Sequence, residues 1–129
     1  MDNNNSKIVL VIDDEEFVTG ALAKKLTGAG YKVLIQRNGE EGLAVALSEH
    51  PDLILLDVVM PKMDGLTMLS KLREDEWGKD VPAIILTNLE SAEKVEESRR
   101  RGVYDYLVKT DWSLSDVLDK VNQALSSRT

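Results

Sequence analysis

The chain has 129 residues, 43% of them apolar, which fits one globular domain of ordinary size with its own core. It has no cysteine, which excludes disulfides and thiolate metal sites, and its net charge of −7 disfavours direct binding to nucleic acid or to anionic membranes. No apolar run approaches the roughly 20 residues of a membrane span, and the start, MDNNNSK, has no apolar signal region, so we expect a cytoplasmic protein.

Five short apolar runs follow one another along the chain, separated by longer amphipathic segments. We expect them to form strands at Ile8–Ile12, Val33–Ile35, Leu53–Leu56, Ala83–Leu86 and Tyr106–Val108. Uninterrupted runs such as LILL are typical of strands that are buried on both faces, as in a parallel sheet.

The segments between these runs carry apolar residues at helical spacing, which predicts a helix after each strand. The expected buried stripes are Val18, Ala21, Leu22 and Leu26, then Leu43, Ala46 and Leu47, then Leu66, Leu69 and Leu72, and finally Leu114, Val117, Leu118, Val121 and Leu125. Two patterns predict capping boxes at helix starts, Asn38 with Glu41 and Ser113 with Asp116. Glycines at 30 and 102 stand where helices are expected to end.

The fourth helical segment, about 91–101, differs from the others because its apolar anchors are only Ala92 and Val95. With so little to bury, we expect it to be the loosest helix. Strand and helix alternate five times, which predicts one doubly wound α/β domain. In this domain we expect a five-stranded parallel sheet with helices on both faces. The single domain would span residues 1–129, and its folded core would extend from about residue 7 to about residue 125.

Polar side chains follow four of the expected strands at their carboxyl ends. Asp13 and Asp14 follow the first strand, Asp57 the third, Thr87 the fourth and Lys109 the fifth. In an open α/β sheet the carboxyl ends of the strands are where sites form. We therefore expect three carboxylates, a hydroxyl and an ammonium group to converge there.

Carboxylates gathered in one place repel one another unless a cation neutralises them. Magnesium prefers oxygen ligands, accepts one or two carboxylates and leaves positions for phosphate oxygens. Three other interpretations remain open from the residues alone. Asp14 or Glu15 could cap the following helix, Lys109 could be a surface lysine, and Thr87 could be an ordinary strand or cap residue.

The motifs VIDDEE, LILLDVVMPKMDG, IILTN and YDYLVK occur in this order along the chain. With these spacings the sequence resembles the receiver domain of two-component response regulators, over about Lys7 to Leu125. The resemblance implies the strand order 2-1-3-4-5. It also implies that Asp57 accepts a phosphoryl group from a sensor histidine kinase, a phosphotransfer protein or a small donor such as acetyl phosphate.

The resemblance also implies a magnesium site, in which manganese could substitute. Asp14 and Asp57 would be ligands, Asp13 would bind largely through water, and the backbone carbonyl of Val59 would complete the protein ligands. In the loop after the acceptor, Pro61 would set a turn, and Asp64 with Gly65 would open the next helix.

Three further residues have roles that the resemblance implies. Thr87 and Lys109 would each contact a phosphoryl oxygen, and Thr87 and Tyr106 would act as the switch. The signal would pass through a surface made of the helix about 91–101, the last strand and the last helix, to a protein partner or an output domain. Such a protein catalyses only its own phosphorylation and dephosphorylation, so we do not expect an enzyme.

The sequence departs from the family pattern after the lysine, where Lys109 is followed by Thr110 and not by the usual proline. This keeps open a receiver-like scaffold that takes no phosphate. A phosphatase with an aspartate nucleophile is a second alternative, but it would need an acid where Val59 stands. A flavin carrier is a third, but it would need a Ser/Thr/Gly-rich phosphate loop in place of DDEE.

Overall fold

The structure is a computed structural model that describes residues 6–87, 93, 105–108 and 113–126. Its centre is one parallel sheet with the strand order β2-β1-β3-β4-β5. The strands are β1 (Ile8–Ile12), β2 (Lys32–Gln36), β3 (Leu53–Asp57), β4 (Ala83–Thr87) and β5 (Asp105–Val108). All five expected strands and their expected order are confirmed, and each observed strand lies within one residue of its predicted ends.

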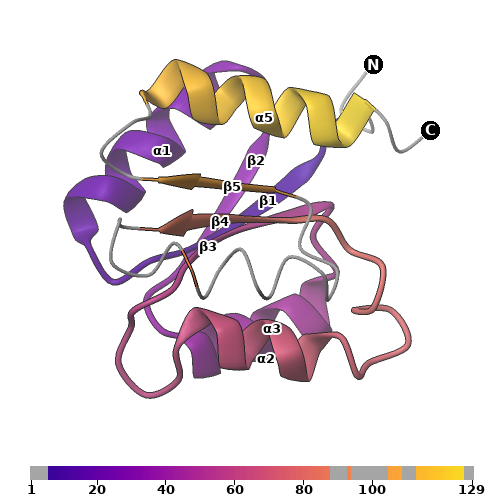
Figure 1. The fold of residues 1–129 in the computed structure, drawn as a ribbon. Coiled ribbons are helices and arrows are strands. Elements are labelled where there is room, and N and C mark those ends of the chain that lie inside the picture. The colour runs from indigo at the N-terminus through magenta and orange to yellow at the C-terminus, as the bar shows by residue number, and fades with distance from the viewer. Residues whose placement is uncertain (1–5, 88–92, 94–104, 109–112, 127–129) are drawn as a thin grey trace.

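Four helices are described: α1 (Glu16–Gly28), α2 (Gly39–Glu49), α3 (Gly65–Leu72) and α5 (Leu114–Ser126). Figure 1 shows α1 and α5 on one face of the sheet and α2 and α3 on the other. The expected helix about 91–101 and its stop at Gly102 lie outside the described residues, apart from residue 93. No helix in the described part of the chain has the length and apolar character needed to cross a membrane.

Alternate residues of each strand point to opposite faces and fill two separate cores. Leu10, Ile54 and Ile85 pack with α2 and α3 on one face, and Val9, Leu55 and Ile84 pack with α1 and α5 on the other. Every residue of β3 and β4 is buried. This double burial explains why their sequences read as unbroken apolar runs.

The expected helix stripes are largely confirmed, with one error in α2. Leu47 is 38% exposed, whereas Ala46 is fully buried. The reason is that α2 lies against the sheet with its smallest residues: a Cβ at Gly42 would stand only 2.5 Å from the Cδ1 of Ile12. Leu47 follows the buried Ala46 by one residue, about 100° around the helix, and therefore lies to the side of the face that contacts the sheet.

The helix boundaries follow the expected signals. The side chain of Asn38 accepts a 2.8 Å hydrogen bond from the Glu41 N–H at the start of α2. At the start of α5, the Ser113 N–H donates to the Asp116 carboxylate at 2.8 Å, and the Asp116 N–H donates to the Ser113 hydroxyl at 3.2 Å. Gly30 has φ +98° just after α1, a conformation that glycine adopts readily.

Candidate functional site

The register of the sheet brings the ends of β1 and β3 together. Ile12, the last residue of β1, pairs with Leu56, so Asp13 follows at the level of Asp57. On the other side of β3, Asp57 pairs with Leu86, and Thr87 is the last residue of β4. The three polar residues Asp13, Asp57 and Thr87 therefore leave neighbouring strands at one edge of the sheet.

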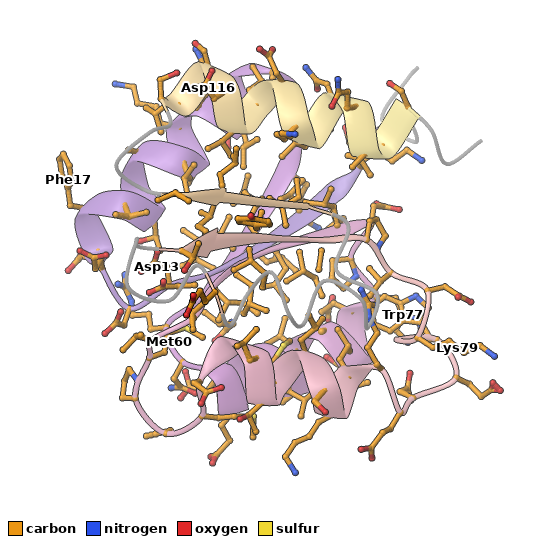
Figure 2. The ribbon with its side chains drawn as sticks, in the orientation of Figure 1. Asp13, Phe17, Met60, Trp77, Lys79 and Asp116 are labelled. Carbon is orange, nitrogen blue, oxygen red and sulfur yellow. The ribbon has the colours of Figure 1, made fainter. Side chains whose placement is uncertain are left out.

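The carboxylates of Asp13, Asp14 and Asp57 form a compact cluster. One carboxylate oxygen from each residue lies within 4.8 Å of the other two. Asp13 is fully buried and Asp57 is only 7% exposed, whereas Asp14 is exposed. Figure 2 shows Asp13 at the end of the sheet toward which the strand arrows point, with Trp77 and Lys79 at the opposite end.

The start of α1 bears on the alternative that these acids serve as helix caps. The N-cap residue of α1 is Glu15, and its side chain makes no capping hydrogen bond. The backbone N–H of Glu15 instead donates to Oδ1 of Asp13 at 3.0 Å. That bond orients the buried Asp13 carboxylate within the cluster. The Glu15 carboxylate does not cap the helix.

Asp57 is held by its own loop. The N–H of Val58 donates to Oδ1 of Asp57 at 2.9 Å, and the N–H of Gly65 donates to the carbonyl of Val58 at 2.8 Å. Asp64 then caps α3 by accepting a 2.7 Å hydrogen bond from the Thr67 N–H. The expectation that Asp64 and Gly65 open this helix is confirmed.

The same loop contains a tight turn and an exposed apolar residue. Lys62 has φ +69°, and the N–H of Met63 donates to the carbonyl of Pro61 at 2.7 Å, which together describe a γ-turn with a positive φ. Val59 is 61% exposed beside this turn. Its side chain carries no group that could hold or orient water.

The other residues named from the sequence are placed less completely. Thr87 is fully buried at the end of β4. Tyr106 of β5 pairs with Ile85 and packs, partly buried, against the core on the α2 and α3 face. Lys109, with its bond to Thr110, lies outside the described residues.

The donor set of the cluster suits a small, hard cation. All three side chains offer carboxylate oxygens, the ligand type that Mg²⁺ and Mn²⁺ prefer. Two of these carboxylates are buried close together, where their mutual repulsion is less screened than in water. The residues present thus fit a divalent metal.

The sequence placed Gly65 at the start of a helix but gave no sign of its contact with Asp57. A Cβ at Gly65 would stand 2.0 Å from the backbone carbonyl oxygen of Asp57. Position 65 therefore has no room for a side chain, because α3 begins directly against the strand end that carries Asp57. Nothing in the local sequence distinguishes this contact from an ordinary glycine at a helix start.

The fold is a doubly wound parallel sheet, and an acidic cluster lies at the carboxyl ends of β1 and β3. Both features are those expected of a receiver domain. Residues 9–122 match the response regulator receiver domain family. The chain belongs to that family, whose members are the receiving parts of two-component signalling systems.

Two sequence relatives and one solved structure illustrate the match. The chain is 42% identical over 109 residues to "Probable transcriptional regulator ycf27" of Pyropia yezoensis, covering 84% of this chain and 43% of that protein. It is 36% identical over 121 residues to "DNA-binding dual master transcriptional regulator RpaA" of Synechocystis, covering 94% of this chain and 49% of that protein. The chain thus spans about half the length of these two relatives.

Among solved structures, the chemotaxis response regulator CheY4 of Vibrio cholerae superposes with a TM-score of 0.85 at 31% identity. The match covers 93% of this chain and 99% of that one.

Proposed function

We propose that this domain is a phosphorylation-controlled signalling switch in which Asp57 is the phosphoacceptor. The observation that carries the proposal is the gathering of three carboxylates, two of them buried, within 4.8 Å at the carboxyl end of the sheet. Membership of the receiver family supports the same role. Repulsion among the carboxylates lowers the stability of the metal-free protein. We therefore propose that the cluster serves to bind a cation, which in turn attracts an anionic phosphoryl group.

Asp13, Asp14, Asp57 and the backbone carbonyl of Val59 are the groups that would hold Mg²⁺, with Mn²⁺ as a substitute. When bound, the metal supplies positive charge that neutralises the carboxylates and attracts phosphoryl oxygens. The first three of these side chains are already together in the structure. Val59 follows Asp57 by two residues, in a loop whose Val58 carbonyl is tied to Gly65.

The chemistry assigned to Asp57 is a single displacement at phosphorus. A carboxylate oxygen of Asp57 forms a bond to phosphorus while the bond from phosphorus to the donor's imidazole nitrogen, or to acetate, breaks. Such transfer depends on alignment and on charge neutralisation. The Val58 N–H on Oδ1 holds the Asp57 carboxylate in one orientation. Thr87 and Lys109 are proposed to contact the phosphoryl oxygens of the product.

The partner that delivers the phosphoryl group is, in this proposal, a sensor histidine kinase or a phosphotransfer protein, and this domain would receive it in the cytoplasm. The named relatives are transcriptional regulators about twice as long as this chain. We therefore propose that the signal leaves through a downstream protein or an output domain, by way of β5 with Tyr106, α5 and the segment about 91–101. Thr87 and Tyr106 would couple that surface to the state of Asp57.

An enzyme acting on other substrates is the less favoured alternative. A hydrolase with an aspartate nucleophile would need a general acid at position 59, but Val59 is an apolar, exposed residue. We propose that the domain catalyses only reactions of its own aspartyl phosphate. The inert scaffold remains the second alternative, and a phosphorylation assay separates it from the switch.

That assay uses acetyl phosphate with millimolar Mg²⁺, followed by intact-protein mass spectrometry. The wild type is expected to gain the mass of one phosphoryl group, and Asp57→Asn is expected to gain none. Asp119→Asn, at an exposed position of α5, is the matched control and should be phosphorylated like the wild type. An unmodified wild type, or an Asp57→Asn protein that still gains the group, would rule out this function.

The lifetime of the phosphoryl group is expected to be long. Neither Val59 nor Leu89 can orient a water molecule for hydrolysis, although Leu89 lies outside the described residues. Replacing either with a polar residue, in Val59→Asn or Leu89→Glu, should leave hydrolysis as fast as in the wild type or faster. The decay of phosphorylated protein after removal of acetyl phosphate measures this, and slower decay in both variants would contradict it.

A further inference from the structure

The loop of residues 58–64 carries Val59 and is fixed at both of its ends. At its start the Val58 carbonyl accepts from the Gly65 N–H at 2.8 Å. At its end Asp64 caps α3 through the Thr67 N–H. These bonds join the loop to α3, but they do not by themselves determine how its middle part lies against the cluster of Asp13, Asp14 and Asp57.

A third attachment comes from the other helix on this face, α2. The N–H of Gly39, the first residue of α2, donates to the carbonyl of Met63 at 3.0 Å. A Cβ at position 39 would stand 2.2 Å from that carbonyl oxygen and 2.9 Å from the carbonyl carbon. The φ of Gly39 lies outside the left-handed region, so glycine is needed here for clearance and not for backbone freedom.

The start of α2 is itself well anchored. Asn38 is buried and caps the helix through the Glu41 N–H at 2.8 Å. One turn further on, Gly42 packs directly against Ile12, the residue before Asp13. The contact from Gly39 to Met63 therefore connects the loop to α2, and α2 in turn packs on β1, the strand that Asp13 and Asp14 follow.

The loop needs such an attachment because its turn is strained. A non-glycine residue in the left-handed region, such as Lys62 at φ +69°, costs roughly 1–3 kcal/mol and persists only where its surroundings hold it. The carbonyl that Gly39 binds belongs to Met63, the residue directly after Lys62. Release of this contact would let the turn relax and carry Val59 with it.

We propose that Gly39 is a positioning residue for the metal site. It holds residues 58–64 in one turn through the Met63 carbonyl and so fixes the position of the Val59 carbonyl, the group that the proposed function assigns to the metal. This inference rests on the proposed function, because it assumes that the cluster and the Val59 carbonyl bind Mg²⁺.

The test compares Gly39→Ala with Gly42→Ala, two substitutions on the same helix that both add one methyl group to a crowded position. The methyl group of Gly39→Ala would clash with the backbone carbonyl of Met63 in the loop, whereas that of Gly42→Ala would clash with the side chain of Ile12. Mg²⁺ affinity is measured by amide NMR titration, and amide hydrogen exchange of Met63 and Gly65 is measured without metal. Gly20→Ala, which meets nothing within 4 Å, controls for the change of residue type.

Gly39→Ala is expected to weaken Mg²⁺ binding by about tenfold, the lower end of the effect of losing a group that orients metal ligands. The Met63 and Gly65 amides should also exchange faster in the metal-free protein. Gly42→Ala should lower the melting temperature and weaken Mg²⁺ binding less than Gly39→Ala does, because it meets the end of a side chain and not the backbone of the loop, and Gly20→Ala should change neither. Asn38→Ala, which removes the cap without pressing on the loop, should weaken binding in the same direction by a smaller factor.

Wild-type affinity in both Gly39→Ala and Asn38→Ala would overturn the inference, as would equal weakening in Gly39→Ala and Gly42→Ala. If Gly39→Ala does not fold, the Mg²⁺ affinity of Asn38→Ala decides.

The proposed function is judged separately on the wild type. A wild type that is phosphorylated while these variants bind Mg²⁺ normally leaves the function standing and removes only the role of Gly39. A wild type that binds no Mg²⁺ removes both.

Discussion

Asp13→Asn is expected to raise the melting temperature of the metal-free protein and to reduce its stabilisation by Mg²⁺. The carboxylate of Asp13 is fully buried, with oxygens of Asp14 and Asp57 within 4.8 Å. Two unit charges about 5 Å apart repel by roughly 3 kcal/mol at an effective dielectric constant of about 20. Solvent at the exposed Asp14 reduces this, so we expect a gain of about 1–2 kcal/mol from removing one charge.

Asparagine suits this test because its side-chain oxygen can still accept the hydrogen bond that Asp13 receives from the Glu15 N–H. The wild type should be stabilised by Mg²⁺ because the metal binds only the folded cluster, by about 1.4 kcal/mol at ten times the dissociation constant. Thermal unfolding with and without Mg²⁺ measures both effects, and Asp119→Asn should behave as the wild type. A less stable metal-free Asp13→Asn, or one that Mg²⁺ still stabilises fully, would contradict the repulsion argument.

Gly65→Ala is expected to lower the free energy of unfolding by about 2–4 kcal/mol, among the larger effects of a single substitution. The added Cβ would stand 2.0 Å from the Asp57 carbonyl oxygen and 3.2 Å from Cγ of Leu56. The nearest obstacle is backbone, so relief requires α3 to shift away from the end of β3. That shift would also break the 2.8 Å bond from the Gly65 N–H to Val58.

Urea unfolding of Gly65→Ala measures the loss, with Gly20→Ala as the matched control. Gly20 lies within α1 and a Cβ there meets nothing within 4 Å, so alanine should be neutral or stabilise by up to about 1 kcal/mol. Phosphorylation of Gly65→Ala by acetyl phosphate should also slow, because loss of the bond from the Gly65 N–H to the Val58 carbonyl loosens the loop that holds Asp57. If Gly65→Ala proves as stable as Gly20→Ala, the close approach of α3 to Asp57 is wrong.

Much of the fold could be predicted from the sequence because its main determinants are local. The apolar runs of β3 and β4 are unbroken since both faces of these strands are buried. The cap at Asn38 could be predicted because it involves residues three apart, and its 2.8 Å bond to the Glu41 N–H is present. The stop at Gly30 is likewise a property of one residue, with φ +98°.

The meeting of the carboxylates could also be predicted, although Asp13 and Asp57 are far apart in sequence. Parallel strands end at one edge of the sheet, so residues directly after neighbouring strands must come close. What the sequence could not provide is the register, which places Ile12 beside Leu56 and hence Asp13 at the level of Asp57.

The contacts of the glycines could not be predicted because they depend on how whole helices are seated. Gly39 faces the Met63 carbonyl and Gly65 faces the Asp57 carbonyl, and both approaches arise only after α2 and α3 pack on the sheet. The error at Leu47 is also one of packing, since α2 contacts the sheet through Gly42 and Ala46 and leaves Leu47 38% exposed. Helical periodicity predicts which face of a helix is buried. How closely that face packs against the sheet depends on the tertiary structure.

The most direct test of a single cation site built by Asp13, Asp14 and Asp57 is paramagnetic broadening of amide NMR signals by substoichiometric Mn²⁺. The earliest losses are expected at residues next to these three aspartates and at Thr87, and an excess of Mg²⁺ should restore the signals. Asp13→Asn should require more Mn²⁺ for the same losses. Broadening that is equally strong around other acidic residues, such as Asp75 and Glu76 in the loop after α3, would contradict the account.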